Sequence, residues 1–221
     1  MNSKVLLLYW IIFSFIIASC SKENIKNCPK EFTIFGKTIP YDSIYSMKDT
    51  IELTIKFSKN VIEKNLNKTY NLQNISFDPS LRVVKIDSGN YLINQKTNEF
   101  INLIYSSDTA YYWHNFSSDG NSILKSHFTF KKDSFYLDLK ITFAKKGLFI
   151  IEFGESFENS SIDFEGKCKN IDFEFHTILN PPKDNNINLL KESPNEYYNK
   201  WLINHPDKFY KRGSYVLKVV N

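Results

Sequence analysis

The sequence lacks the motifs by which many enzymes and cofactor-binding proteins are recognised. It has 7 glycines in 221 residues, and none belongs to a Gly-x-Ser-x-Gly elbow, a phosphate loop or a Gly-x-Gly-x-x-Gly turn. His-Glu-x-x-His is missing as well. These absences leave no motif for a serine hydrolase, a P-loop nucleotidase, a Rossmann dehydrogenase or a zincin. We therefore expect no cofactor, no metal ion and no catalytic residue.

A large excess of one charge is also missing. The chain has 28 Lys and Arg against 24 Asp and Glu, which gives a net charge of +4. Such mild basicity, spread along the chain, argues against a dedicated nucleic-acid surface. We expect no nucleic-acid partner.

No apolar run is long enough to cross a bilayer. The longest extends from Val5 to Ala18, with Ser14 as its only polar residue, and it follows Lys4. A spanning helix needs about 20 apolar residues, whereas a positive start and a shorter apolar core are typical of a secretory signal peptide. The sequence therefore predicts export.

The apolar run ends in Ile17-Ala18-Ser19-Cys20, and this stretch resembles the lipobox of bacterial lipoproteins. The resemblance implies that residues 1–19 are a signal peptide and that Cys20 becomes the first mature residue. It also implies that Cys20 carries acyl chains such as palmitate. Several chains, each contributing about 0.8 kcal/mol per buried CH2, would anchor the protein stably in a membrane. The alternative is an uncleaved signal anchor, or an ordinary signal with a chance cysteine.

The residue after Cys20 bears on the choice of membrane. In the lipoprotein family an aspartate there often marks retention in the inner membrane, and this chain has Ser21. The resemblance therefore implies the cell outer membrane, with residues 20–30 as a lipidated tether. Lys22 and Glu23 resemble signals that send some lipoproteins to the cell surface, but a periplasmic and a surface-facing position both stay open.

Cysteine is scarce, and with Cys20 assigned to lipid only Cys28 and Cys168 remain. In an oxidising compartment an even pair of cysteines predicts one disulfide. No Cys-x-x-Cys motif indicates a redox or metal role, so two unpaired thiols are the main alternative. The disulfide would close a loop of about 140 residues and hold the tether against the fold.

Aromatic and β-branched residues are abundant, and many alternate with polar residues as they do in strands. The clearest alternation covers 51–57 and 135–143, and further strands are expected at 32–38, 70–77, 81–87, 100–105, 110–116, 171–176 and 214–220. Residues 122–153 are predicted to form a three-stranded meander. Many short strands at this spacing favour an all-β, mainly antiparallel fold, an immunoglobulin-like sandwich or a related one. The domain would span 31–221, with a split into two lobes near 106–121 as an open alternative.

One short C-terminal helix is expected after these strands. Ser193-Pro194-Asn195-Glu196 has the form of a capping box with proline at the first helical position. Apolar residues follow at helical spacing, and His205-Pro206 predicts the end of the helix.

Two groups of polar residues could carry chemistry. Asp172, Glu174 and His176 alternate with phenylalanines, so their side chains would share one strand face and could hold a metal or transfer protons. The solvated face of an ordinary amphipathic strand is the interpretation we favour. Residues 152, 155 and 158 are all glutamates and could supply a glycosidase pair, although solvated edge or loop charges explain them more simply.

Tyr111, Trp113 and Trp201 are the candidate ligand-binding aromatics. Sugar faces stack on aromatic rings, and Asn115 lies close in sequence to the first two. Aromatic packing in the core and at its rim is the favoured alternative, because 16% of the residues are aromatic.

The sequence as a whole predicts a lipoprotein of the outer membrane with a non-catalytic binding, adhesion or structural role in the cell envelope. Its expected partners are the membrane, through the lipid anchor, and a glycan or another envelope protein. The alternative is a hydrolase acting on polysaccharide of the envelope or cell surface. Two carboxylates converging in a cleft would mark that alternative.

Overall fold

A computed structural model describes residues 28–87, 96–104, 111–116, 120–157, 163–164, 168–169, 171 and 173–221. The signal peptide, Cys20 and most of the tether lie outside these residues, as do Asp172 and Glu158. None of the described helices is both long and apolar enough to cross a membrane.

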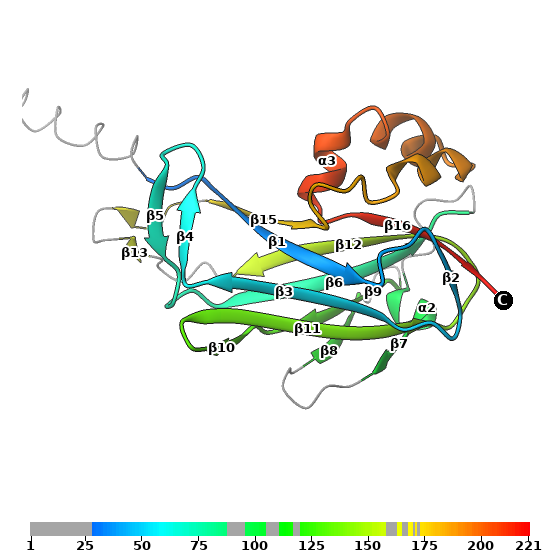
Figure 1. Cartoon of the computed structure of the whole chain (residues 1–221), viewed down its shortest axis with the longest axis horizontal. Coiled ribbons are helices and arrows are strands. Elements are labelled where there is room, and N and C mark those ends of the chain that lie inside the picture. Colours follow the sequence, from blue (N-terminus) through cyan, green and yellow to red (C-terminus); the bar gives the residue numbers. More distant parts are fainter. Residues whose placement is uncertain are drawn as a thin grey trace, which may run out of the picture.

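Within the described residues, two six-stranded sheets form a β-sandwich (Figure 1). Sheet one has the order β10 (Thr129–Lys131), β11 (Ser134–Phe143), β3 (Ile51–Ser58), β1 (Glu31–Ile39) and β15 (Glu174–Leu179), and β7 (Ile101–Ile104) also pairs with β11. Sheet two has the order β2 (Ile44–Ser46), β16 (Tyr215–Val220), β12 (Gly147–Phe157), β6 (Phe77–Lys85), β9 (Ser122–Ser126) and β8 (Tyr111–Asn115). The pairs β1–β15 and β16–β2 are parallel and the others are antiparallel, so the all-β, mainly antiparallel prediction is confirmed.

Smaller elements flank the sandwich. β4 (Asn60–Glu63) and β5 (Lys68–Asn71) form a hairpin, β13 (Asp163–Phe164) pairs with β14 (Cys168–Lys169), and α2 (Thr97–Phe100) is a single turn. Strands from both sides of residues 106–121 contribute to each of the two large sheets.

The sandwich core follows from the alternation in the sequence. In β3 the residues Ile51, Leu53 and Ile55 are buried, while the residues between them reach the outer face of sheet one. Aromatic rings fill the space between the sheets: Phe57 stacks on Phe135 with ring centroids 4.8 Å apart. Each fully buried side chain of this size contributes about 1.5–3 kcal/mol to folding.

A second, smaller core lies on the outer face of sheet two. Here β6, β12 and β16 are apolar on both faces, because helical segments cover the side turned away from the sandwich core (Figure 1). The segments are η2 (Ile187–Glu192), η3 (Tyr197–Leu202) and α3 (Pro206–Lys211), which together we call the helical cover. Leu190, Tyr198, Leu202 and Phe209 of the cover pack against Val84, Ile86, Leu148, Ile150 and Val216.

The expected helix is present, but the predicted capping box is wrong. Glu196 precedes η3 without a side-chain cap hydrogen bond, and the Tyr197 backbone N–H donates to Oδ1 of Asn195 at 2.9 Å. The Ser193 hydroxyl donates instead to the carbonyl oxygen of Ile86 and joins the cover to sheet two. Pro206 starts α3 rather than only ending the helix before it.

The predicted meander over 122–153 is also wrong in part. The β10–β11 hairpin forms, but β12 leaves β11 and pairs with β6 and β16 in the other sheet. Leu148, Phe149, Ile150 and Ile151 are buried in succession, so this strand needs a cover on both faces. Sheet two, with the helical cover behind it, provides both faces.

Candidate functional site

Beyond the end of the helical cover, the outer face of sheet two becomes polar. Alternation turns Ser80 and Arg82 of β6 outward, and β12 does the same with Glu152 and Gly154. Strand register places Arg82 directly opposite Glu152 and Ser80 opposite Gly154. Ile123 of β9 extends this floor on the far side of β6.

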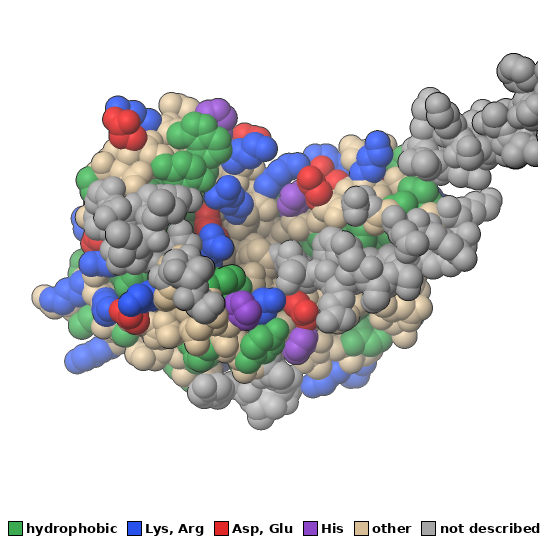
Figure 2. All heavy atoms as spheres, turned by 180° about the vertical axis from the view of Figure 1, so that it is seen from behind, with side chains coloured by type: hydrophobic (Ala, Val, Ile, Leu, Met, Phe, Trp, Pro, Cys, Tyr) green, Lys and Arg blue, Asp and Glu red, His purple; other side chains and the backbone are tan. Residues whose placement is uncertain are grey.

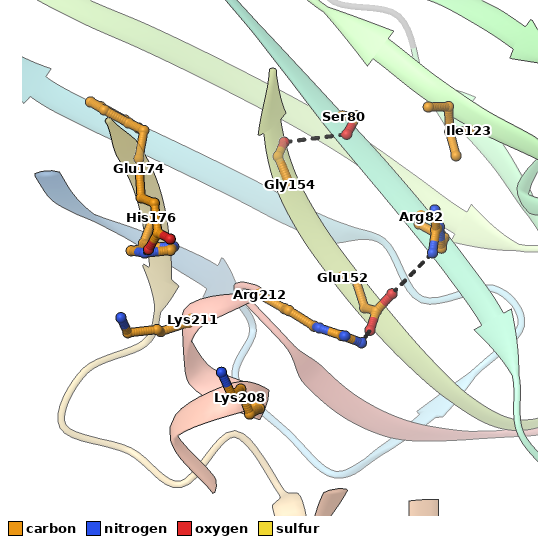
Figure 3. A pocket seen from close by; sticks show the side chains of 11 residues that line it. Ser80, Arg82, Ile123, Glu152, Gly154, Glu174, His176, Lys208, Lys211 and Arg212 are labelled. Carbon is orange, nitrogen blue, oxygen red and sulfur yellow. Dashed lines mark hydrogen bonds and ion pairs between the residues drawn. The ribbon is translucent and has the colours of Figure 1, made fainter. Parts of the chain in front are cut away.

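Two walls rise from this floor and flank an open cavity of about 600 Å³. One wall is α3, which supplies Lys208 and Lys211 and is followed by Arg212. The other wall is β15, with Glu174 and His176 (Figure 3). Figure 2 shows a hollow beside the helical cover, with Lys and Arg side chains around it and acidic and histidine side chains at its edge. We call this cavity, with its floor and two walls, the charged cleft.

Glu152 is the centre of the charged cleft. Its Oε2 lies 3.7 Å from Nη1 of Arg82, and its Oε1 lies 3.4 Å from Nη1 of Arg212 (Figure 3). Arg212 also donates to the Tyr197 hydroxyl at 2.9 Å. The Glu152 side chain is 14% exposed, whereas Arg82 and Arg212 are 41% and 45% exposed. Glu152 thus holds two guanidinium groups that still face solvent and retain free N–H donors.

The surroundings of Arg212 favour the protonated, positively charged form of its guanidinium group. Burial by itself lowers the pKa of Arg212, but Glu152 and the Tyr197 hydroxyl more than offset burial, so the pKa is raised above its ordinary value. Arg212 is therefore a permanent cation at any physiological pH.

A second cluster lies where β15 borders β1. Parallel register puts Glu31 opposite Glu174, and ligand atoms of Glu31, Glu174 and His176 all lie within 4.8 Å of one another. These groups have the chemistry of a metal-ligand set. Lys211 already provides a cation, since its Nζ lies 3.2 Å from Oε1 of Glu31. His176 Nε2 lies 3.0 Å from Oε2 of Glu174, and the group forms a network of polar contacts in one wall of the cleft.

The cleft has a positive balance. Among its described lining residues, Arg82, Lys208, Lys211 and Arg212 are cationic, and only Glu152 and Glu174 are anionic. Each of these carboxylates already has a basic partner. An anionic group entering from solvent would therefore find unsatisfied N–H donors.

The candidate aromatics do not meet in this cleft. Tyr111 and Trp113 are half-buried on the edge strand β8 and pack against the sandwich core, where the Tyr111 hydroxyl donates to the carbonyl of Asp138. Trp201 lies on the helical cover, stacked between Tyr197 and His205 at centroid distances of 5.1 and 4.6 Å. Ligand binding by these rings stays a prediction.

Sequence patterns gave only a partial indication of the cleft. Glu174, His176 and Glu152 were singled out, but Glu31 was missed because parallel pairing with β15 joins residues more than 140 positions apart. Arg82 and Arg212 were missed as well. A signal was present for Arg82: a lone cation in the otherwise apolar stretch Leu81–Val84 is unusual when a strand is buried on both faces.

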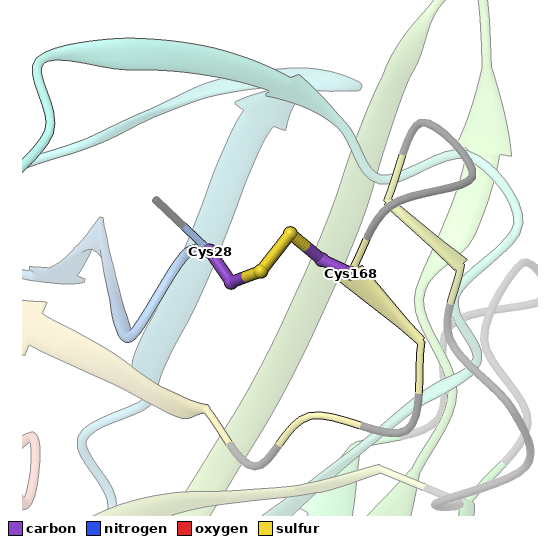
Figure 4. Close-up of a disulfide and its surroundings, with 2 residues drawn as sticks. All are labelled: Cys28 and Cys168. Carbon is purple, nitrogen blue, oxygen red and sulfur yellow. A yellow bond between two sulfur atoms is a disulfide. The ribbon is translucent and has the colours of Figure 1, made fainter. Parts of the chain in front are cut away.

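The predicted disulfide joins Cys28 and Cys168 (Figure 4), with a Cα–Cα distance of 5.6 Å. Both cysteines are buried, and the bond ties the chain before β1 to β14, 140 residues later. The prediction of a disulfide is confirmed, and the segment leading into β1 is held against the sandwich.

Comparisons with known proteins leave the family open. No family model matches the sequence, and no curated protein matches it either. The chain is similar to the reeler domain of human F-spondin, with a TM-score of 0.32 and 8% identity over 64% of this chain and 90% of that one. It is also similar to the second type II cohesin module of the ScaA scaffoldin from Acetivibrio cellulolyticus, with a TM-score of 0.30 and 13% identity over 67% and 94% of the two chains.

A cohesin module from a family 33 glycoside hydrolase of Clostridium perfringens gives a TM-score of 0.26 at 8% identity, covering 65% of this chain and 91% of that one. All three likenesses are remote, and no residue role is transferred from them. The function must be argued from the charged cleft itself.

Proposed function

We propose that the protein is a lipid-anchored, non-catalytic binding protein of the bacterial outer membrane, and that the charged cleft is its ligand site. The lipobox resemblance of Ile17-Ala18-Ser19-Cys20 supports the anchor. The arrangement around Glu152 carries the binding role, because one carboxylate holds two half-exposed arginines in a solvent-open cavity.

The physical advantage of this arrangement is preorganisation. A free arginine loses side-chain freedom when it binds an anion, at a cost of roughly 0.5–1.5 kcal/mol. Hydrogen bonds to Glu152 and to the Tyr197 hydroxyl already order Arg212 in the free protein, and an ion pair at 3.7 Å keeps Arg82 beside the same carboxylate. A ligand therefore meets donors that are fixed in place before it arrives.

The anchor is tested by expressing the full chain with a C-terminal tag in a bacterium with an outer membrane. We expect the protein to take up an alkyne-labelled palmitate and to fractionate with the outer membrane. The Cys20→Ser variant should lose the label and appear in a soluble fraction. Unlabelled protein, or equal fractionation of both forms, would contradict the proposed anchor.

The binding role is tested with the full-length protein purified in detergent and added to isolated cell envelopes. The Arg82→Ala/Arg212→Ala double variant should be retained several-fold less than the wild type. Lys59→Ala/Lys140→Ala is the matched control, since it also removes two ion-paired cations and neither lysine lines the cleft. Equal retention of the double variant and the wild type would contradict a role for the charged cleft.

A polysaccharide hydrolase is the second candidate, and one observation favours it: Glu152 and Glu174 line the same cleft. A glycosidase uses two such carboxylates on either side of the bond it cleaves. The binding proposal predicts no release of reducing ends from envelope polysaccharide. Turnover that disappears in both Glu152→Gln and Glu174→Gln, with the fold intact, would establish the hydrolase instead.

A further inference from the structure

The polar groups of the charged cleft define the chemistry of a complementary ligand. Arginine and lysine offer N–H donors and positive charge, so they match carboxylate, sulfate or phosphate oxygens. The Glu174 carboxylate accepts hydrogen bonds only, and its side chain is 69% exposed. A ligand that satisfies both kinds of group needs anionic oxygens and hydroxyl donors on one molecule.

Apolar contacts contribute little to this site. Ile123 and Phe175 are the apolar side chains among the described lining residues, and the floor is otherwise made of Ser80, Gly154 and charged groups. A lipid tail or an apolar peptide would leave these charges desolvated without partners, which is costly. The lining instead suits a ligand that is polar along its whole length.

We infer that the charged cleft binds an acidic saccharide chain, with an anionic group on Arg82 and Arg212 and sugar hydroxyls on Glu174 and His176. This inference rests on the proposed function and specifies its ligand class. The donors around Glu152 form the anion subsite, and the β15 wall forms the hydroxyl subsite (Figure 3). Lys208 and Lys211, both exposed on α3, provide charge for a second anionic group along the chain.

The position of the cleft is consistent with a chain ligand. The floor crosses β12, β6 and β9, and it is open to solvent beside the helical cover (Figure 2). Gly154 has no side chain and that of Ser80 is small, so little rises from the floor in the row next to Arg82. A saccharide ring can therefore approach the backbone there.

The test is calorimetric titration of the full-length protein in detergent with four probes. Oligogalacturonate carries carboxylates, a heparin-derived oligosaccharide carries sulfates, maltohexaose is neutral, and inorganic sulfate lacks the sugar. We expect at least one of the two acidic oligosaccharides to bind. Comparing their affinities shows whether the anion subsite prefers a carboxylate or a sulfate. Maltohexaose and inorganic sulfate should bind at least about tenfold more weakly, because each lacks one of the two kinds of group.

Glu152→Gln separates a built site from general attraction between charges. This substitution makes the cleft more positive, and it replaces the carboxylate that pairs with both arginines by an amide whose single acceptor oxygen can serve only one of them. Nonspecific attraction predicts tighter binding of acidic saccharide by Glu152→Gln, whereas the built site predicts weaker binding, by about tenfold. Arg82→Ala should weaken binding to a similar extent, and Lys140→Ala, which removes the same charge elsewhere, should not.

The outcomes separate this inference from the proposed function. Acidic saccharide binding lost in Arg82→Ala and in Glu152→Gln supports the inference. Equal or tighter binding by Glu152→Gln, or no binding of either acidic oligosaccharide, overturns it. If envelope retention still depends on Arg82 and Arg212 in that case, the cleft remains a ligand site for another class of molecule. If retention does not depend on them, the proposed function fails as well.

Discussion

Two ends of the same strand pair, β6 and β12, differ sharply on the outer face of sheet two. At one end Val84 and Ile150 lie opposite each other, and both are buried under the helical cover. Two residues along each strand, Arg82 and Glu152 lie opposite each other and face the charged cleft. The helical cover ends at the point where these strands change from apolar to charged residues on their outer face.

The difference explains why the cleft is open. Burying an ion pair such as Arg82–Glu152 under a helix would cost several kcal/mol in desolvation per charge. The apolar end must instead be covered, because each Å² of valine and isoleucine surface left in water would cost about 25 cal/mol of stability. One strand pair thus carries a stability site and a candidate binding site side by side, and variants at the two ends should have different effects.

The largest effect is expected from Phe209→Ala in the helical cover. Phe209 is fully buried against sheet two, so its loss should lower the free energy of unfolding by about 3–5 kcal/mol. Urea denaturation followed by tryptophan fluorescence measures this change. A loss below about 1 kcal/mol would mean that the cover adds little stability, and the contrast between the two ends would disappear.

Gly213→Ala tests the junction between the two ends. Gly213 has φ +56°, and an added Cβ would lie 2.9 Å from the carbonyl oxygens of both Phe153 and Thr177. We expect a loss of about 2–3 kcal/mol of stability, because strain and crowding coincide at this residue. The same denaturation experiment checks it. Unchanged stability would mean that the chain between Arg212 and β16 adjusts freely, so that the arginine is not held in place.

Glu63→Gln contrasts a structural carboxylate with Glu152. Glu63 is fully buried and accepts hydrogen bonds from the backbone N–H of Leu66 at 2.6 Å, of Glu31 at 3.3 Å and of Lys30 at 3.4 Å, and from the Asn65 amide at 3.1 Å. Burial by itself raises the pKa of Glu63, but these donors outweigh it and the pKa lies below its ordinary value. The substitution should cost about 1–3 kcal/mol at neutral pH.

The sign of the pH dependence follows from the lowered pKa. Glu63 stabilises the fold above the ordinary glutamate pKa of about 4.3, and this contribution is lost as the pH falls through the lower pKa of the folded state. The stability gap between the wild type and Glu63→Gln should therefore stay constant from neutral pH down to about pH 4.3 and shrink as the pH falls further. A gap that widens on acidification would show that the carboxylate is not the stabilising form.

The smallest effect on stability is expected from Arg82→Ala. The Arg82 side chain is 41% exposed, and ion pairs in such positions contribute about 0–1 kcal/mol. Unfolding should therefore change by less than about 1 kcal/mol while ligand binding falls. Destabilisation as large as that of Phe209→Ala would mean that Arg82 contributes mainly to folding. That result would contradict its role in a ligand site.

Most of the fold could be predicted from the sequence. Where one face of a strand meets solvent, apolar and polar residues alternate with a period of two, and this pattern identifies the strand. Phe135 to Phe143 and Ile51 to Phe57 are of this kind. The disulfide followed from an even pair of cysteines in an exported chain. β12 was identified as a strand but assigned to the wrong neighbours, because a continuous apolar run shows that both faces are covered without showing by what.

The cleft could be predicted only in fragments. Arg82, Glu152, His176 and Arg212 come from separate parts of the chain and meet through sheet pairing and the return of the chain over sheet two. No local pattern contains that information. Glu31 illustrates the point, since only the parallel pairing of β1 with β15 brings it to Glu174.

The most direct test of the central claim is lysine footprinting of the full-length protein with and without oligogalacturonate or the heparin-derived oligosaccharide. Lys211 in the cleft and Lys140 on the outer face of sheet one are a matched pair, with side chains 42% and 43% exposed and each paired with one glutamate. The account predicts that the bound saccharide protects Lys208 and Lys211 from acylation while Lys140 reacts at an unchanged rate. Equal protection of Lys211 and Lys140, or protection of neither, would contradict a ligand site in the charged cleft.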